Sequence, residues 1–171
     1  MVQLQDKLSD HFKFYEAVHS DTAFRLGINN VPADEEIIAA LKYHSKGVLE
    51  PIRKEFGAFS PLSWYRGEVL ERTICQDAFL KWCKKRNYQA SEAAWELYFM
   101  RKSHPKGEAA DIRIPGVSNH DLYNFIVDNL EYDQVILEFV PENNPFAGWV
   151  HVSSIDEGAQ RKNRMQAFNI S

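Results

Sequence analysis

The sequence contains little cysteine, glycine or proline, and each shortage excludes a class of protein. Two cysteines among 171 residues cannot build a disulfide framework, so we expect Cys75 and Cys83 to be free thiols. Eight glycines and seven prolines, beside 44% hydrophobic residues, exclude fibrous and disordered chains. Length and composition therefore predict a single globular domain over residues 1–171.

An excess of positive charge and long apolar runs are also absent. The net charge of −4 lacks the basic surface on which non-specific nucleic-acid binding depends. No window approaches the roughly 18 apolar residues of a membrane span, and residues 1–7 have neither the basic nor the apolar region of a signal peptide. We therefore expect no nucleic-acid partner, no membrane span, and synthesis in the cytoplasm without a signal peptide.

Helical patterns come first in the chain, and strand patterns mostly follow them. Apolar residues recur at helical spacing over 33–56, where Pro51 predicts a kink or a break, and over 68–102, where two helices are expected with a break near 86–88. The later patterns predict a strand at 109–114, a helix capped by Ser118, and strands at 133–140 and 149–153. This order predicts an α+β fold in which N-terminal helices pack on a small antiparallel sheet.

Three residues form the sharpest set of potential metal ligands. His104 and Asp111 are seven residues apart across the turn 105–107, and His151 lies in the middle of a predicted strand. Two histidines and one carboxylate are a ligand set that leaves a position open for water on a catalytic zinc. A chain with six histidines offers many such triples, so spacing alone leaves open that these histidines never meet.

Two further charged residues are candidates for catalysis. Glu138 lies in an apolar strand, where it is either a solvent-facing edge residue or a general base with a pKa raised by burial. Arg66 forms either a surface ion pair or a bidentate clamp on a substrate carboxylate. The aromatic residues between 79 and 99 favour helix packing over a carbohydrate platform.

The segments around these residues resemble the zinc D-Ala-D-Ala carboxypeptidases, which share their fold with the hedgehog signalling domain. In that family a histidine is followed by a Gly three residues later and then by an Ala and an Asp, with the Asp seven residues after the histidine. A strand with the pattern Trp-x-His follows much later in the chain. The matching residues here are His104, Gly107, Ala109 and Asp111, then Trp149 and His151. Residues 63–66 resemble the family's Ser-Gly-Tyr-Arg motif, and residues 20–32 resemble the N-terminal segment of phage-encoded members. The likeness covers roughly residues 8–155.

The resemblance implies a hedgehog/D,D-peptidase-like fold with one Zn²⁺ held by His104, Asp111 and His151. It implies that Glu138 accepts a proton from a zinc-activated water and that Arg66 holds the substrate or the transition state. The substrate-binding residues that it implies are Ser63, Tyr65, Ser103 and Trp149.

The activity implied is that of a phage-type zinc peptidase acting on peptidoglycan stem peptides. It would cleave D-alanine-containing peptide bonds as a D,D-carboxypeptidase or an endopeptidase, at the bacterial cell wall or periplasm or as a virion component. The alternative is a non-catalytic wall-binding or virion structural module that retains the fold.

The sequence departs from the family pattern close to the proposed site. Many members carry the base three residues before the last histidine, where this chain has Gly148, so the role passes to Glu138. The other replacements are Trp64 for the Gly of the arginine motif, Glu71 for an Asn and Lys102 for a Ser.

Two segments lie outside the resemblance. Residues 72–102 form a helical insertion where the family has a short loop, and it is interpreted as a lid, a specificity element or a partner-binding surface. Residues 156–171 are a polar, basic tail, which is either a solvated end or a site of attraction to an anionic polymer. Because the chain is acidic overall, attraction to an anionic wall must come from a local patch such as this tail.

Overall fold

A computed structural model describes residues 3–155 and 163–167, and it has the expected α+β organisation. Five helical segments precede the insertion: α1 (Phe14–Val18), α2 (Asp21–Leu26), α3 (Glu35–His44), the π-helical η1 (Ser45–Leu49) and α4 (Glu50–Phe56). The insertion and its exit contain α5 (Glu68–Ile74), α6 (Gln76–Arg86), α7 (Glu92–Phe99) and the 3-10 turn η2 (His104–Lys106). The remaining elements are β1 (Ala109–Ile112), α8 (Asn119–Asn129), β2 (Gln134–Glu138), β3 (Trp149–Ser153) and β4 (Asn163–Ala167).

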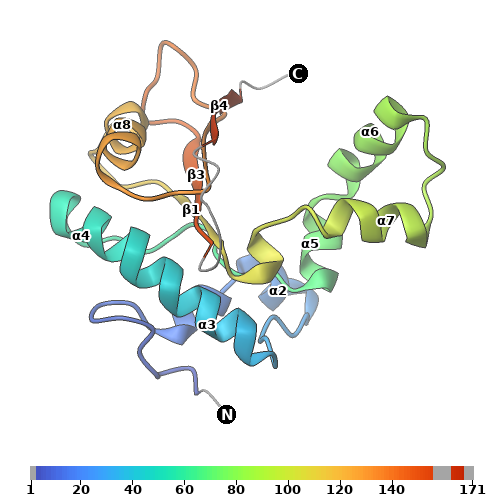
Figure 1. Cartoon of the computed structure of the whole chain (residues 1–171), viewed down its shortest axis with the longest axis horizontal. Coiled ribbons are helices and arrows are strands. Elements are labelled where there is room, and N and C mark those ends of the chain that lie inside the picture. Colours follow the sequence, from blue (N-terminus) through green and yellow to red (C-terminus); the bar gives the residue numbers. More distant parts are fainter. Residues whose placement is uncertain (1–2, 156–162, 168–171) are drawn as a thin grey trace.

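The helix predicted over 33–56 is a single long helical stretch with a π-helical turn inside it (Figure 1). It begins after Asp34, whose carboxylate accepts a hydrogen bond from the N–H of Glu36, and it ends at Gly57, which has a φ of 90°. The disruption expected at Pro51 takes the form of η1 directly before it. Proline has no N–H to donate to the preceding turn, so the wider π-helical turn precedes a new α-helical segment in which Pro51 lies in the first turn.

The sheet has the strand order β1-β3-β2-β4. The first three strands pair antiparallel, as expected, but β4 runs parallel to β2. The prediction that 156–171 is only a polar tail is therefore wrong for 163–167, while 156–162 and 168–171 lie outside the described residues. A strand at a sheet edge pairs through its backbone and does not require an apolar pattern, so residues 163–167 carry no sequence pattern that predicts a strand.

The main hydrophobic core lies between one face of the sheet and the helices α3, α4 and α8. Ser118 caps α8, as predicted, by accepting hydrogen bonds from the N–H groups of His120 and Asp121. The sheet contributes alternate residues to this core: Ala110, Ile112, Val135, Leu137, Val150 and Val152. Because side chains alternate along a strand, the residues between them face the other side of the sheet.

The insertion has a small core of its own and projects from the body (Figure 1). The aromatic residues pack among the helices, as expected, in a cluster of Phe79, Cys83, Ala94, Trp95 and Tyr98. The segment contains three helices rather than the predicted two, since a further break occurs at Cys75 in addition to the one at Asn87. Both cysteines are free thiols.

Candidate metal centre and cleft

Strand alternation brings the expected metal ligands to one face of the sheet. Asp111 on β1 is the register partner of His151 on β3, and Ile136 on β2 is paired with His151 from the other side. Their neighbours Ile112 and Val150 point into the core, so Asp111 and His151 point away from it. The turn η2 delivers His104 to the same place, and all three side chains are buried.

The three side chains offer ligand atoms that lie within 4.8 Å of one another. Asp111 Oδ1 lies 3.2 Å from His104 Nε2 and 2.9 Å from His151 Nδ1. Ligands held at about 2.0 Å around a tetrahedral zinc are about 3.3 Å apart, so this spacing fits such an ion. The prediction that His104, Asp111 and His151 meet is therefore confirmed.

The hydrogen bonding of His104 leaves a lone pair directed at Asp111. Its Nδ1 lies 2.6 Å from the carbonyl oxygen of Trp64, which accepts only a hydrogen bond, so Nδ1 carries the proton. Burial lowers the pKa of His104, which favours the neutral ring. In that ring Nε2 is an acceptor that faces another acceptor, Asp111 Oδ1, and a cation between them resolves the repulsion.

The carboxylate of Asp111 is held from its other side by Arg66. Arg66 Nη2 donates to Asp111 Oδ2, and Arg66 Nε donates to Ser63 Oγ at 2.7 Å. Burial disfavours the charged carboxylate, but His104, His151 and Arg66 hold the pKa of Asp111 well below its usual range. The backbone adds to this arrangement, because the N–H of Asp111 donates to the carbonyl oxygen of Ser63 at 2.8 Å.

Glu138 lies at the end of β2, opposite Trp149 in the register and on the same side of the sheet as His151. Burial raises its pKa, and the nearby Asp111 carboxylate raises it further, against the opposing effects of His151 and Arg66. A carboxylate with a raised pKa beside the three ligands fits the requirements of a general base.

Gly148 cannot be replaced by the carboxylate that the family pattern has at this position. Its φ is +73°, and a Cβ atom built there would lie 2.2 Å from the carbonyl oxygen of Glu138. The loop between β2 and β3 closes so tightly that only glycine fits next to the base candidate. The geometry therefore leaves Glu138 as the glutamate that this hairpin presents to the cleft.

A cleft of about 810 Å³ contains this group of residues. Ser63, Ser103 and Trp149 line it, as expected of substrate-binding residues, together with the three ligands, Arg66 and Glu138. Tyr65 does not line it. It lies in the main core and its backbone N–H donates to the carbonyl oxygen of Ala17, so its side chain is directed away from the cleft.

Helix α5 and the insertion that follows it line part of the cleft, and α5 adds a carboxylate, Glu71, that the sequence marked only as a departure. Glu71 is 1% exposed. Its Oε2 lies 3.5 Å from Arg66 Nη1, and its Oε1 lies 3.7 Å from Lys102 Nζ and accepts a hydrogen bond from the thiol of Cys75 at 3.0 Å. The sequence feature that could have marked Glu71 as part of the site is its position next to Leu70 on the buried side of α5, because a buried carboxylate requires charged or hydrogen-bonding partners.

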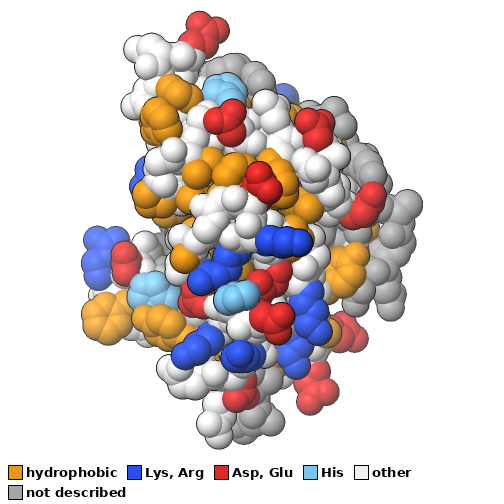
Figure 2. Space-filling model, turned by 90° about the vertical axis from the view of Figure 1, so that its left-hand side faces the viewer, with side chains coloured by type: hydrophobic (Ala, Val, Ile, Leu, Met, Phe, Trp, Pro, Cys, Tyr) orange, Lys and Arg blue, Asp and Glu red, His pale blue; other side chains and the backbone are white. Residues whose placement is uncertain are grey.

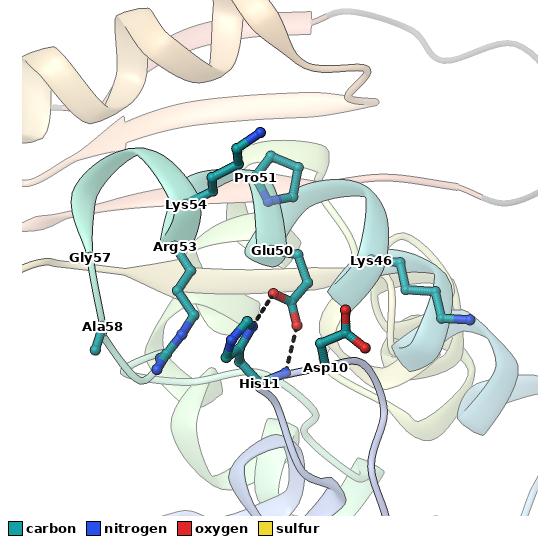
Figure 3. A pocket seen from close by; sticks show the side chains of 9 residues that line it. All are labelled: Asp10, His11, Lys46, Glu50, Pro51, Arg53, Lys54, Gly57 and Ala58. Carbon is teal, nitrogen blue, oxygen red and sulfur yellow. Dashed lines mark hydrogen bonds and ion pairs between the residues drawn. The ribbon is translucent and has the colours of Figure 1, made fainter.

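A second depression, of about 720 Å³, lies on the surface formed by α4 and the N-terminal loop (Figure 3). There Glu50 accepts a hydrogen bond from the backbone N–H of His11 and pairs with its ring at 2.7 Å. Lys46, Arg53, Lys54 and Asp10 surround the pair. Figure 2, which shows the left-hand side of the view in Figure 1, has red and blue side chains interspersed. The described residues of this depression include no group of potential metal ligands.

Comparisons with known proteins give no relative for this chain. No family model matches it, and neither the curated proteins nor the solved structures contain a match. None of the described helices has the length and apolarity needed to cross a membrane. The function must therefore be argued from the residues and geometry of the cleft.

Proposed function

We propose that this protein is a zinc-dependent peptidase that hydrolyses D-alanine-containing peptide bonds of bacterial peptidoglycan. The observation that carries the proposal is the buried His104–Asp111–His151 group, in which an Asp111 oxygen lies 2.9–3.2 Å from a ring nitrogen of each histidine and which lines a cleft. The resemblance of the surrounding segments to zinc D-Ala-D-Ala carboxypeptidases supplies the substrate class and the D,D-peptidase-like fold.

The three ligands would hold one zinc ion, which would act as a Lewis acid and lower the pKa of a water molecule. Trp64 holds the ring of His104 through its carbonyl oxygen, and Arg66 holds the carboxylate of Asp111. Such partners outside the ligands fix ring and carboxylate orientation.

Glu138 is the residue to which we assign the proton transfer. Its carboxylate would accept the proton of the attacking water and deliver it to the leaving amine. Its raised pKa supports this role, because a base works best with a pKa nearer to the operating pH than that of an ordinary carboxylate.

We assign to Arg66 the stabilisation of the negative charge that develops on the substrate during the reaction. It lines the cleft but its three donor groups already contact Asp111, Ser63 and Glu71, so it is a fixed cation and not a mobile one. A preorganised positive charge beside the scissile carbonyl stabilises a tetrahedral oxyanion without reorganising. Ser63, Ser103 and Trp149 would contact the peptide on either side of that bond.

The place of action follows from the substrate. Peptidoglycan lies outside the cytoplasmic membrane, so the protein would act at the wall or periplasm during lysis, or as part of a virion during entry.

The first test is zinc content. Elemental analysis of protein purified without added metal is expected to give one zinc per chain, and none in the His104→Ala, His151→Ala double variant. Zinc that is absent from the parent, or retained by the double variant, would overturn the proposal. Metal-bound protein that cosediments with walls but cleaves no wall peptide would instead indicate the non-catalytic module.

A further inference from the structure

The distal end of helix α6 carries a cationic cluster that the proposed catalytic site does not use. Lys81, Lys84, Lys85 and Arg86 are all exposed, and α6 contains one carboxylate, Asp77. Within residues 3–155, none of these four cations lies within ion-pair distance of a carboxylate. The charge is therefore locally segregated in a chain whose net charge is −4.

Helix geometry places three of these charges side by side. Lys84 and Lys85 follow Lys81 by three and four residues, so they neighbour it on the helix surface, while Phe79 and Cys83 bury the opposite face. Like charges at this spacing repel each other. The helix dipole favours cations in the last turn, but Lys81 lies before that turn. The helix dipole therefore accounts for Lys84, Lys85 and Arg86 but not for Lys81.

The cluster is presented beside the cleft. Ala78 of α6 lines the cleft, and Arg86 follows eight residues later, about 12 Å further along the helix axis. α6 and α7 project from the body, which leaves the cationic end accessible (Figure 1). A long ligand bound there would be held close to the candidate active site.

The cations of the depression on α4 lie among acids. Lys46, Arg53 and Lys54 share their depression with Asp10 and Glu50, so that surface presents no block of one sign (Figure 3). The end of α6 is thus the better candidate for attraction to a polyanion than this depression.

We propose that Lys81, Lys84, Lys85 and Arg86 bind a wall-attached anionic polymer whose charges are phosphate groups. The choice of a wall polymer rests on the proposed function. Lysine binds phosphate as a compact point charge on a flexible stem, which suits phosphates repeated along a mobile chain. Duplex DNA carries repeated phosphates as well, so it enters the test as the competing ligand.

The test compares two triple variants of the full, zinc-loaded chain in cosedimentation with purified walls. In the first, Lys81, Lys84 and Lys85 are changed to Gln, while Arg86 stays because its guanidinium packs 4.9 Å from the centre of the Trp82 ring. In the matched control, the exposed Lys42, Lys46 and Lys54 are changed to Gln, which alters the net charge equally. Walls with their phosphate polymers and walls extracted to remove them are used in parallel, and circular dichroism checks folding.

The first variant is expected to bind intact walls about tenfold more weakly than the parent, as the loss of three exposed charge contacts implies. The control is expected to bind like the parent, and extracted walls should bind the parent and the first variant equally weakly. Any of three results would overturn the inference. The two variants could bind intact walls equally, the parent could bind extracted walls as well as intact ones, or the parent could bind duplex DNA more tightly than walls.

Hydrolysis of a short soluble wall peptide separates this inference from the proposed function. The first variant should cleave it at the parent rate, because the cluster lies outside the cleft lining. If the parent cleaves nothing but the binding results are as expected, the proposed function fails and the polymer site stands. If cleavage of the soluble peptide falls with the first variant, the cluster acts on the cleft itself and the inference fails.

Discussion

Replacing Glu71 by Gln should weaken zinc binding, although Glu71 is not a ligand. Its two carboxylate oxygens lie 3.5 Å from Arg66 Nη1 and 3.7 Å from Lys102 Nζ. Arg66 in turn donates to Asp111, whose other oxygen faces both histidines. Without the charge of Glu71, two cations beside the ligands lose a counter-charge and repel a divalent cation more strongly.

The expected loss of zinc affinity is about tenfold, or about 1.4 kcal/mol. Removing a group that directly supports a metal ligand typically costs about 10–100-fold in affinity, and Glu71 acts one step further out, through Arg66. Gln keeps the shape of the side chain and an oxygen that can accept the hydrogen bond from Cys75. The free energy of unfolding of the metal-free protein should fall by about 1–3 kcal/mol, since a buried charge contact is lost.

The assay is a competition titration of metal-free protein against a chromophoric zinc chelator at fixed pH. Glu96→Gln is the matched control, because Glu96 is an exposed carboxylate on the nearby helix α7 and its loss changes the net charge equally. Equal zinc affinities in the two variants would refute the reasoning that Glu71 supports the metal site through Arg66.

Three further predictions concern the hairpin, a buried histidine and the proposed base. Gly148→Ala should lower the free energy of unfolding in urea by roughly 1–3 kcal/mol more than Gly116→Ala, since Gly116 also has positive φ but open space around it; equal losses would contradict the close approach to Glu138. Burial and the nearby His151 and His104 lower the pKa of His44 from 6.5 to about 3, so unfolding takes up a proton below pH 6.5 and stability should fall by up to about 1.4 kcal/mol per pH unit between pH 6 and 4. His44→Asn should reduce that slope, and an unchanged slope would contradict it. Glu138→Gln should lower turnover roughly 10²–10⁴-fold with zinc content unchanged, whereas turnover at the parent rate would place the base elsewhere.

Features that depend on local chemistry were predictable from the sequence. The cap at Ser118 and the strand over 149–153 follow from a side chain that accepts backbone hydrogen bonds and from a short β-rich run. Spacing alone left the meeting of Asp111 and His151 open; the family resemblance implied it, and the antiparallel pairing of their two strands brings the side chains together.

Features that depend on distant parts of the chain were not predictable. β4 pairs parallel to β2 through its backbone, and its sequence has no strand pattern that distinguishes it from a polar tail. Glu71 joins the site because α5 packs it against Arg66 and Lys102, a contact that the spacing along the chain does not reveal. Tyr65 belongs to a motif in which Ser63 and Arg66 line the cleft, yet Tyr65 lies in the main core together with Trp64, and the spacing along the motif does not reveal this.

The most direct test of the central claim is mass spectrometry of purified peptidoglycan incubated with the zinc-loaded protein. Hydrolysis of a bond involving D-alanine would appear as two products whose summed mass exceeds that of the parent peptide by one water. The reaction should stop when zinc is removed and resume when zinc is restored. If peptidoglycan stays uncleaved after incubation with folded, zinc-loaded protein, this result would contradict the claim that the His104–Asp111–His151 cleft is the active site of a peptidoglycan peptidase.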